Sequence, residues 1–447
     1  MDWDVVIVGA GLAGLSCGLE LALKNKKVLL LEVDPVVGGR CSNWNENGME
    51  VESGFHRFIG YYSALPALLK KAGVEVDEMV TWEEKIDVLI KGKNKKLVVG
   101  ISPLMGPVKM LRGIYGNEDI LTAKDKLSLV PFFIRGFKDY LLAPEKLDSY
   151  SVKEYANLHK VTGNALHYLL IPLSSGIFFL PPDRYSAYAF FGLFAPAIPK
   201  FYKMRIGAYL GGMTDVMCQP IADKIMELGG SIELGVNVVD VLTDEEGKVI
   251  GVLTDKGKEF KGKHVVIAAS LAGAKQILER FKNEPSFENF FKLPTMPAAT
   301  LQIELTEPAL EKDITTFGPK TSLASFAEQS RTTFRGSKGR LSIILTPAEE
   351  FLTKSPDETL KIVVGDAKAL GIHLEGKIKD YRQINHPADF YSLAPGVNPL
   401  RPTQATAIKG LTLAGDYTRQ PYFSTMEGAV VSGQRAAQLV VKALGEV

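Results

Sequence analysis

The sequence predicts an α/β fold in which a Rossmann-like domain carries a second, mixed α+β domain as an insertion. Two observations predict it. The chain opens with a strand–helix–strand unit that contains a glycine-rich turn. Strand and helix patterns follow each other again near residue 211 and near residue 411. The 447 residues exceed what one ordinary core accommodates, so we expect several domains or one large interrupted domain.

The opening unit follows from the order of apolar residues and glycines. Asp4–Val8 is a short apolar run rich in β-branched residues, as in a buried parallel strand, and it ends at the glycine-rich turn 9–14. Apolar residues then recur at helical spacing over residues 15–23. Val28–Leu31 is a second buried strand, and it ends at Glu32.

The later segments differ in composition and in the strand or helix patterns that they contain. Residues 101–204 combine helical patterns with many aromatic residues and prolines, which predicts a mostly helical, apolar subdomain. Residues 211–270 return to α/β character, residues 275–400 are mixed, and the chain closes with a strand and a long helix. The elements that we expect are strands at Ser231–Leu234, Val236–Leu242, Val249–Thr254, His264–Ala269, Thr300–Leu305, Arg340–Leu345 and Leu411–Leu413, and helices at Pro220–Leu228 and Thr425–Ala443.

Composition excludes several classes of function. Lys+Arg 52 nearly cancels Asp+Glu 51, so no overall positive field recruits phosphates and nucleic acid is not expected as a partner. The three cysteines, Cys17, Cys41 and Cys218, have no CxxC spacing, and we expect neither a disulfide framework nor a metal site. A reducing, cytoplasmic location fits this pattern.

Targeting and spanning segments are not expected. The first residues run directly into a strand rather than into a signal peptide. The best apolar stretch, Ala187–Pro199, is shorter than the about 18 residues that a spanning helix needs. We therefore expect at most a peripheral attachment to a membrane.

The glycine-rich turn has the form of a dinucleotide fingerprint. Gly9, Gly11 and Gly14 form GxGxxG between a predicted strand and a predicted helix, and Glu32 ends the next strand. The glycines let the backbone, including that of Leu12 and Ala13 between them, approach a pyrophosphate at the helix N-terminus. Glu32 is expected to accept hydrogen bonds from a ribose, and it disfavours a 2′-phosphate. The fingerprint alone leaves FAD and NAD both open.

The residues after Glu32 resemble the flavin amine oxidase and phytoene desaturase superfamily. Gly38-Gly39-Arg40 and the segment from Glu52 to Phe58 (ESGFHRF) carry this resemblance. It implies FAD as the cofactor in a GR2-type FAD-binding domain, with Gly39 and Arg40 near the phosphates of FAD. It also implies that the segment around His56 lies near the flavin ring, which makes His56 a candidate catalytic residue.

Two further stretches are similar to the same family. Residues 220–240 (PIADKIMELGGSIELGVNVVD) place Val238 where the family contacts the adenine by its main chain. Residues 413–433 hold AGDYT and MEGAVVSG, similar to the C-terminal signature of plant-type phytoene and ζ-carotene desaturases. This resemblance implies that Gly415 and Asp416 hold the ribityl and phosphate region. It also implies that the Met426 N–H stabilises negative charge on the reduced ring.

The resemblance divides the chain into two expected units. The segments that resemble the family surround others that do not, and the latter are expected to hold the substrate. We predict a discontinuous FAD-binding domain from residues 1–80, 205–280 and 390–447, and a substrate-binding domain from residues 81–204 and 281–389.

The predicted chemistry is hydride transfer to or from flavin N5. Only one dinucleotide fingerprint is present, so we expect electrons to pass to or from a quinone, oxygen or another diffusible carrier rather than a nicotinamide. Ser174–Tyr202 is expected to line an apolar tunnel, dip into a membrane interface or form plain core. The other histidines, namely His159, His167, His264, His373 and His386, are scattered and expected to be structural.

Three hypotheses for the function remain open at this point. The first is an FAD-dependent, carotene desaturase-like oxidoreductase with an apolar, isoprenoid substrate. The second is an amine oxidase or protoporphyrinogen oxidase, which shares the cofactor architecture but needs an amine cage or a tetrapyrrole pocket. The third is a flavin-holding partner protein without turnover.

Overall fold

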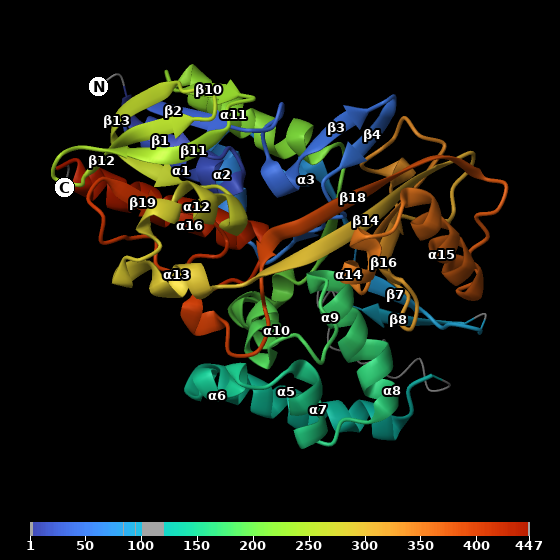
Figure 1. Ribbon diagram of the computed structural model, residues 1–447. Coiled ribbons are helices and arrows are strands. Elements are labelled where there is room, and N and C mark those ends of the chain that lie inside the picture. The colour runs from blue at the N-terminus through green and yellow to red at the C-terminus, as the bar shows by residue number, and fades with distance from the viewer. Residues whose placement is uncertain (1–2, 84, 94, 101–119, 446–447) are drawn as a thin grey trace.

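The computed structural model describes residues 3–83, 85–93, 95–100 and 120–445 (Figure 1). The helical segment predicted for residues 101–204 therefore begins outside the described residues. The described part contains two seven-stranded sheets, two smaller sheets and a group of helices that lies apart from them at the bottom of Figure 1.

The first large sheet carries the glycine-rich turn. Its order is β10-β2-β1-β13-β12-β11, and β19 pairs with β13. β1 runs parallel to β2 and β13, and β13 runs parallel to β19, so the carboxyl ends of these four strands meet at one edge. The strands are β1 (Trp3–Val8), β2 (Val28–Glu32), β10 (Ser231–Leu234), β11 (Val238–Thr243), β12 (Val249–Thr254), β13 (Glu259–Ile267) and β19 (Leu411–Leu413).

The strands expected in this sheet are confirmed, with other bounds for two of them. β13 covers Glu259–Ile267 instead of the predicted His264–Ala269, and the second difference is at β11. This strand begins at Val238 and not at the predicted Val236. Val236 N donates to Glu32 O at 2.8 Å, so Val236 continues beside the end of β2 instead of pairing with β12. The apolar run around Val236 gives no sign of this change of partner.

The second large sheet packs beside the first and is built mostly from antiparallel strands. Its order is β18-β14-β17-β16-β15-β7-β8, and its two longest strands, β14 and β18, run together across the molecule (Figure 1). The predicted strands Thr300–Leu305 and Arg340–Leu345 are the C-terminal parts of β14 and β17. The strands are β7 (Lys85–Leu89), β8 (Lys96–Gly100), β14 (Thr295–Leu305), β15 (Thr316–Phe317), β16 (Leu323–Glu328), β17 (Gly339–Leu345) and β18 (Ile378–Tyr391).

Two small sheets lie between these elements. β3 (Asn43–Glu46) pairs with β4 (Met49–Glu52), and β9 (Ile206–Tyr209) lies between β5 (Phe58–Ile59) and β6 (Val80–Glu83). The segment that follows β4 leads to β5, which pairs with β9. The predicted boundaries of two domains stay a prediction.

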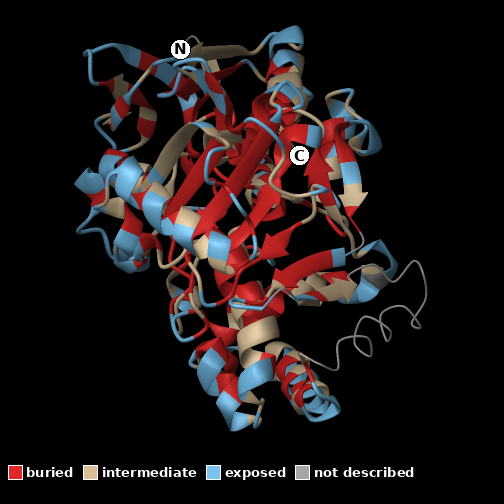
Figure 2. Cartoon of the chain, turned by 90° about the vertical axis from the view of Figure 1, so that its right-hand side faces the viewer, coloured by how far each residue is buried: buried red, intermediate tan, exposed pale blue. Residues whose placement is uncertain are grey.

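The described part of the predicted helical subdomain is helical, and aromatic residues form its core. Tyr185, Phe190 and Phe191 are completely buried, and Phe191 also packs against Phe132 and Phe137. Figure 2 shows the mixture of buried and exposed faces in this lower group of helices. Its helices are α5 (Ala123–Leu142), α6 (Pro144–Asp148), α7 (Val152–Leu158), α8 (Gly163–Ala165), η3 (Leu166–Leu170), α9 (Ile171–Phe178), α10 (Ala187–Phe194) and η4 (Ala195–Lys203).

Two helices at the ends of the chain pack closely on each other beside the first sheet. A Cβ on Gly433 of α16 would lie 2.2 Å from Ala13 O, so only glycine permits the approach of α16 (Met426–Ala443) to α1 (Leu12–Ala22). Ser16 Oγ adds a hydrogen bond to Val430 O at 3.0 Å. This contact joins the N-terminal and C-terminal parts of the chain in one layer.

The remaining helices are short, apart from α15. Among all helices of the described ranges, none combines the length and the hydropathy needed to cross a bilayer. The remaining helices are η1 (Gly39–Cys41), α2 (Ala64–Lys71), α3 (Val76–Met79), η5 (Thr214–Cys218), α11 (Gln219–Glu227), α12 (Leu271–Ile277), η6 (Glu279–Phe281), η7 (Pro285–Phe287), α13 (Glu288–Lys292), η8 (Gln329–Arg331), α14 (Ala348–Leu352), α15 (Pro356–Ala369) and η9 (Asn398–Leu400).

Candidate functional site

A cavity of about 740 Å³ opens at the edge where the parallel strands end. The residues that follow β1, β2, β13 and β19 all contribute to its wall, because the carboxyl ends of parallel strands lie at one edge of a sheet. Hydrogen bonds fix this edge: Gly9 N donates to Leu31 O, Ala268 N to Val8 O, and Ala414 N to Ile267 O. Four stretches that are far apart in the sequence therefore converge on one site.

The glycine-rich turn forms a cradle for a ligand. A Cβ on Gly14 would lie 1.9 Å from Gly9 O, so Gly14 allows α1 to start against the turn. Gly11 lines the cavity, and a Cβ there would meet only Gly38 O at 3.8 Å within the protein. The side chain that is missing at Gly11 thus leaves space in the cavity. No side chain among the described residues caps the first turn of α1, whose N–H groups suit a pyrophosphate.

Glu32 lies buried in the cavity wall at the end of β2. Its Oε2 accepts from Ala10 N at 2.6 Å and its Oε1 from Asp34 N at 3.0 Å, which fixes the carboxylate between the turn and the strand end. Burial raises the pKa of Glu32, and the two backbone donors oppose this effect. A fixed carboxylate at this position suits a ribose hydroxyl.

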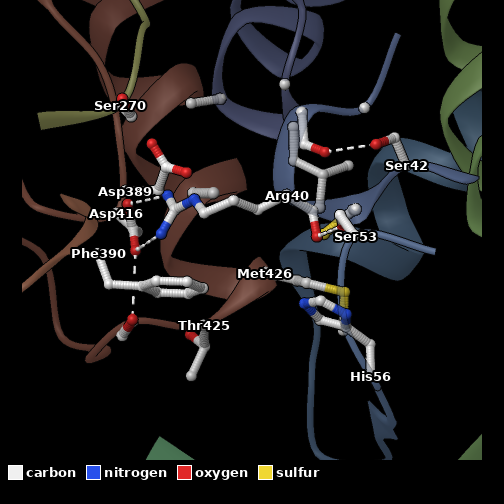
Figure 3. Close-up of a pocket in the computed structure, with 18 of the residues that line it drawn as sticks. Arg40, Ser42, Ser53, His56, Ser270, Asp389, Phe390, Asp416, Thr425 and Met426 are labelled. Carbon is white, nitrogen blue, oxygen red and sulfur yellow. Dashed lines mark hydrogen bonds and ion pairs between the residues drawn. The ribbon is translucent and has the colours of Figure 1, made fainter. Parts of the chain in front are cut away.

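An ion pair between Arg40 and Asp416 joins the two ends of the chain inside the cavity (Figure 3). Arg40 Nη2 lies 2.6 Å from Asp416 Oδ1, and Nη1 lies 3.1 Å from Oδ2, which is a bidentate geometry. The guanidinium also lies 4.8 Å from the ring centre of Phe390. Burial opposes the charge of Arg40, but Asp416 outweighs burial and raises the pKa of Arg40.

Arg401 holds the loop that carries Asp416, although the sequence analysis assigned no role to it. It is 2% exposed, and its Nη2 donates to the carbonyl oxygens of Asp416, Thr418 and Tyr422 at 3.1, 2.6 and 3.1 Å. Its guanidinium also lies over the ring of Tyr391 at 5.2 Å. In the sequence, only the proline-rich segment before AGDYT draws attention to Arg401, because its contacts with carbonyl oxygens arise only in the folded loop.

Most of the predicted site residues line this one cavity. Gly14 is the exception: it lies behind the wall and supports the turn. The predicted residues in the wall are Gly9, Gly11, Leu12, Ala13, Glu32, Gly39, Arg40, His56, Val238, Gly415, Asp416 and Met426. Their individual contacts with a cofactor stay predictions.

His56 has a defined protonation state. Its Nδ1 lies 2.6 Å from Gly54 O, and because a carbonyl only accepts, Nδ1 carries the hydrogen and Nε2 keeps a lone pair. Burial lowers the pKa of His56 to about 4, and the nearby positive charge of Arg40 acts in the same direction. The ring in the cavity wall is therefore neutral at physiological pH.

A further part of the wall is mainly apolar and comes from elements outside the first sheet, although Arg57, Arg205, Thr315 and Ser325 also line the cavity. Residues of α9, α10 and the second sheet form it, and they include part of the predicted tunnel segment 174–202. The apolar residues concerned are Ile86, Leu173, Ile177, Phe179, Leu193, Phe194, Phe317 and Ile344. Because other aromatic residues of the segment are completely buried in the helical group, this segment is partly cavity wall and partly core.

The fold and the site define the class of protein: a dinucleotide-binding α/β protein with an apolar chamber against the dinucleotide cradle. Residues 12–441 match the model of the family described as "Flavin containing amine oxidoreductase". The chain belongs to this family. It is an FAD-dependent oxidoreductase, and the cavity residues described above fit that cofactor.

Related proteins support the same family. A 15-cis-phytoene desaturase of Glycine max is 29% identical over 98% of this chain and 79% of its own length. A zeta-carotene desaturase of Synechocystis sp. is 27% identical over 98% of this chain and 97% of its own. Among solved structures, a putrescine oxidase bound to putrescine has a TM-score of 0.75 at 17% identity and covers 99% of both chains. At this identity the last comparison concerns the fold.

Proposed function

We propose that this enzyme oxidises or reduces an apolar, isoprenoid-like substrate in the manner of a carotene desaturase. The observation that carries the proposal is the apolar wall formed by α9, α10 and the second sheet, which continues directly from the cradle. The names of the desaturases to which the chain is similar state hydrocarbons of this kind, phytoene and zeta-carotene, as their substrates. Bound FAD supplies a two-electron acceptor for this chemistry.

The chain's own residues have three tasks in this proposal. The turn 9–14, Glu32 and Val238 hold the adenosine and pyrophosphate side of FAD, and Arg40 and Asp416 hold the chain between pyrophosphate and ring. The start of α16 at Met426 supplies N–H groups and positive potential beside the flavin. The apolar wall orients the substrate and excludes water.

His56 is the proposed proton acceptor. Forming a double bond removes a proton as well as a hydride equivalent, and Nε2 of the neutral imidazole can hold that proton. We expect His56→Ala to lower kcat about 100-fold, with FAD affinity retained, and added imidazole to restore part of the rate. The wild-type rate should fall as the pH approaches the pKa of His56, about 4, because the protonated ring no longer accepts. Unchanged kcat in His56→Ala would refute this role.

Anaerobic reduction of the bound flavin tests the proposed function. The purified holoprotein is mixed with carotene precursors in liposomes, and loss of flavin absorbance reports electron transfer. We expect reduction by isoprenoids, and reoxidation by a quinone or another diffusible carrier added afterwards. Reduction by primary or secondary amines, with hydrogen peroxide formed in air, would favour an amine oxidase. Flavin that no substrate reduces and no acceptor reoxidises would favour the partner-protein hypothesis.

We further propose that α5 attaches the protein to anionic membranes from the cytoplasmic side. Leu127, Ile134 and Leu141 recur every seventh residue on this helix and are 68%, 65% and 72% exposed, so they form one apolar stripe. Both acidic side chains of α5 accept hydrogen bonds from the protein itself: Asp125 from Thr122 and Asp139 from Tyr155. The exposed charges on this helix are basic, namely Lys124, Arg135 and Lys138.

Replacing the stripe tests this attachment. We expect the triple variant Leu127→Ser, Ile134→Ser and Leu141→Ser to bind anionic liposomes more than about tenfold more weakly, because three apolar side chains are lost from the interface. Co-sedimentation measures the binding. Ile362→Ser, which removes an exposed apolar residue from α15, is the matched control and should bind normally. Equal binding by the triple variant and the control would contradict the proposal.

A further inference from the structure

The long strand β18 of the second sheet brings a histidine and a carboxylate to the FAD cavity. His386 and Asp389 both lie on β18 and both line the cavity. His386 Nδ1 lies 2.8 Å from Asp389 Oδ2, and His386 Nε2 lies 2.6 Å from Ser53 O. Figure 3 shows Asp389 and Ser53 on the two sides of Arg40.

Both partners of His386 are acceptors. A backbone carbonyl cannot donate a hydrogen, and the Asp389 carboxylate, whose pKa is lowered chiefly by its hydrogen bond from His386, is ionised. A neutral imidazole donates from only one nitrogen and would leave one of the two short contacts without a hydrogen. The two contacts together are satisfied only when His386 is an imidazolium.

The imidazolium is connected through Ser53 to Arg40 and Asp416, the pair that we propose holds FAD. The Ser53 hydroxyl donates to Arg40 O, and Arg40 holds Asp416 in the bidentate pair described above. We propose that His386 is a positioning residue whose protonated form ties β18 to Ser53 and Arg40, so that FAD binds more tightly when His386 is charged. This inference rests on the FAD site and does not depend on the identity of the substrate.

Charged groups from several elements lie near His386. Three carboxylates act on it or on the neighbouring Arg40: Asp34 after β2, Asp389 on its own strand and Asp416 after β19. Arg40 and His56 are the nitrogen bases nearby, and only Arg40 is charged, since the pKa of His56 is about 4. The phosphates of FAD add negative charge to the same wall. Glu52 precedes Ser53, and burial raises its pKa to about 7, so the test must separate its titration from that of His386.

The test compares the affinity of apoprotein for FAD in wild type and His386→Gln at a series of pH values. Glutamine can donate to Ser53 O but has no titrating proton. Near pH 6 we expect the Kd of His386→Gln to be about tenfold higher than that of the wild type, because one charge-assisted hydrogen bond is lost. Near pH 9 the ratio should approach about one, because an imidazole that has lost its second proton can no longer donate to both acceptors. The ratio removes the effect of Glu52, which both proteins share.

Two controls separate positioning from folding. His373→Gln changes an exposed histidine and should give a ratio of about one at every pH. Thermal unfolding of the apoproteins reports whether His386→Gln is folded, and nitrogen-15 spectra of labelled histidine report the charge of His386 in the holoprotein directly. A ratio that does not change with pH, or a neutral His386 in the holoprotein near pH 6, would overturn the inference. If the wild type binds no FAD at any pH, the site assignment fails together with it.

Discussion

Replacing Gly14 by alanine is expected to abolish FAD binding and to destabilise the fold by more than about 3 kcal/mol. The new Cβ would lie 1.9 Å from Gly9 O, and this neighbour is backbone, so no side chain can turn away to make room. Either the turn or the start of α1 must shift, and both shifts disrupt the cradle. Flavin absorbance of the purified protein and chemical denaturation measure the two effects.

Two other glycines provide matched controls. Gly11→Ala should fold normally but bind FAD about ten- to hundredfold more weakly, because its Cβ meets open cavity space and not protein. Gly365→Ala, in the middle of α15 with nothing within 4 Å, should stabilise the protein by about 1 kcal/mol. Normal flavin content and stability in Gly14→Ala would show that the turn is not the rigid cradle described here.

Replacing Glu427 by alanine is expected to destabilise the protein by about 4 kcal/mol. Glu427 follows Met426 in α16, is completely buried, and accepts from the backbone N–H groups of Ser63, Ala64 and Leu65 at 2.7, 2.7 and 2.9 Å. These groups begin α2, so the carboxylate caps a second helix from outside. Its removal leaves the N–H groups without their acceptor, and denaturant unfolding of the apoprotein measures the loss.

Two further glutamate variants calibrate this effect. Glu427→Gln keeps an acceptor oxygen and should lose about half as much stability. Glu288→Ala also removes a first-turn glutamate, but that side chain is exposed and pairs with Lys292, so the stability should stay close to that of the wild type. If Glu427→Ala were as stable as Glu288→Ala, water would be replacing the carboxylate at α2 without loss.

The parts of the fold that follow local rules were predictable from the sequence. In β1, α1 and β2 the apolar residues follow the spacing of strands and then of a helix, and a glycine-rich turn separates β1 from α1. A strand followed by a helix recurs as β19 and α16 near the other end of the chain. The path of the chain between sheets was not predictable in this way. Val236 is apolar like the strand that follows, but its hydrogen bond goes to the end of β2.

The residues of the FAD site divide in the same manner. Gly9, Gly11, Gly14 and Glu32 were predicted from a motif, and Arg40 and Asp416 from a resemblance. The sequence gives no sign that Arg40 and Asp416 pair with each other, since 376 positions separate them. His386 was expected to be structural, and its contact with Ser53 depends on how β18 lies against the segment after β4. Glu427 caps a helix that is equally remote in the chain.

The pairing of β19 with β13 has a consequence for biosynthesis. While the ribosome is still making residues before 411, the sheet lacks β19 and Arg40 lacks Asp416. Proteins are made from the N-terminus, so the cradle around Gly11 emerges first and waits for most of translation. Asp416 and β19 therefore complete the FAD site late in synthesis, after most of the chain has been made.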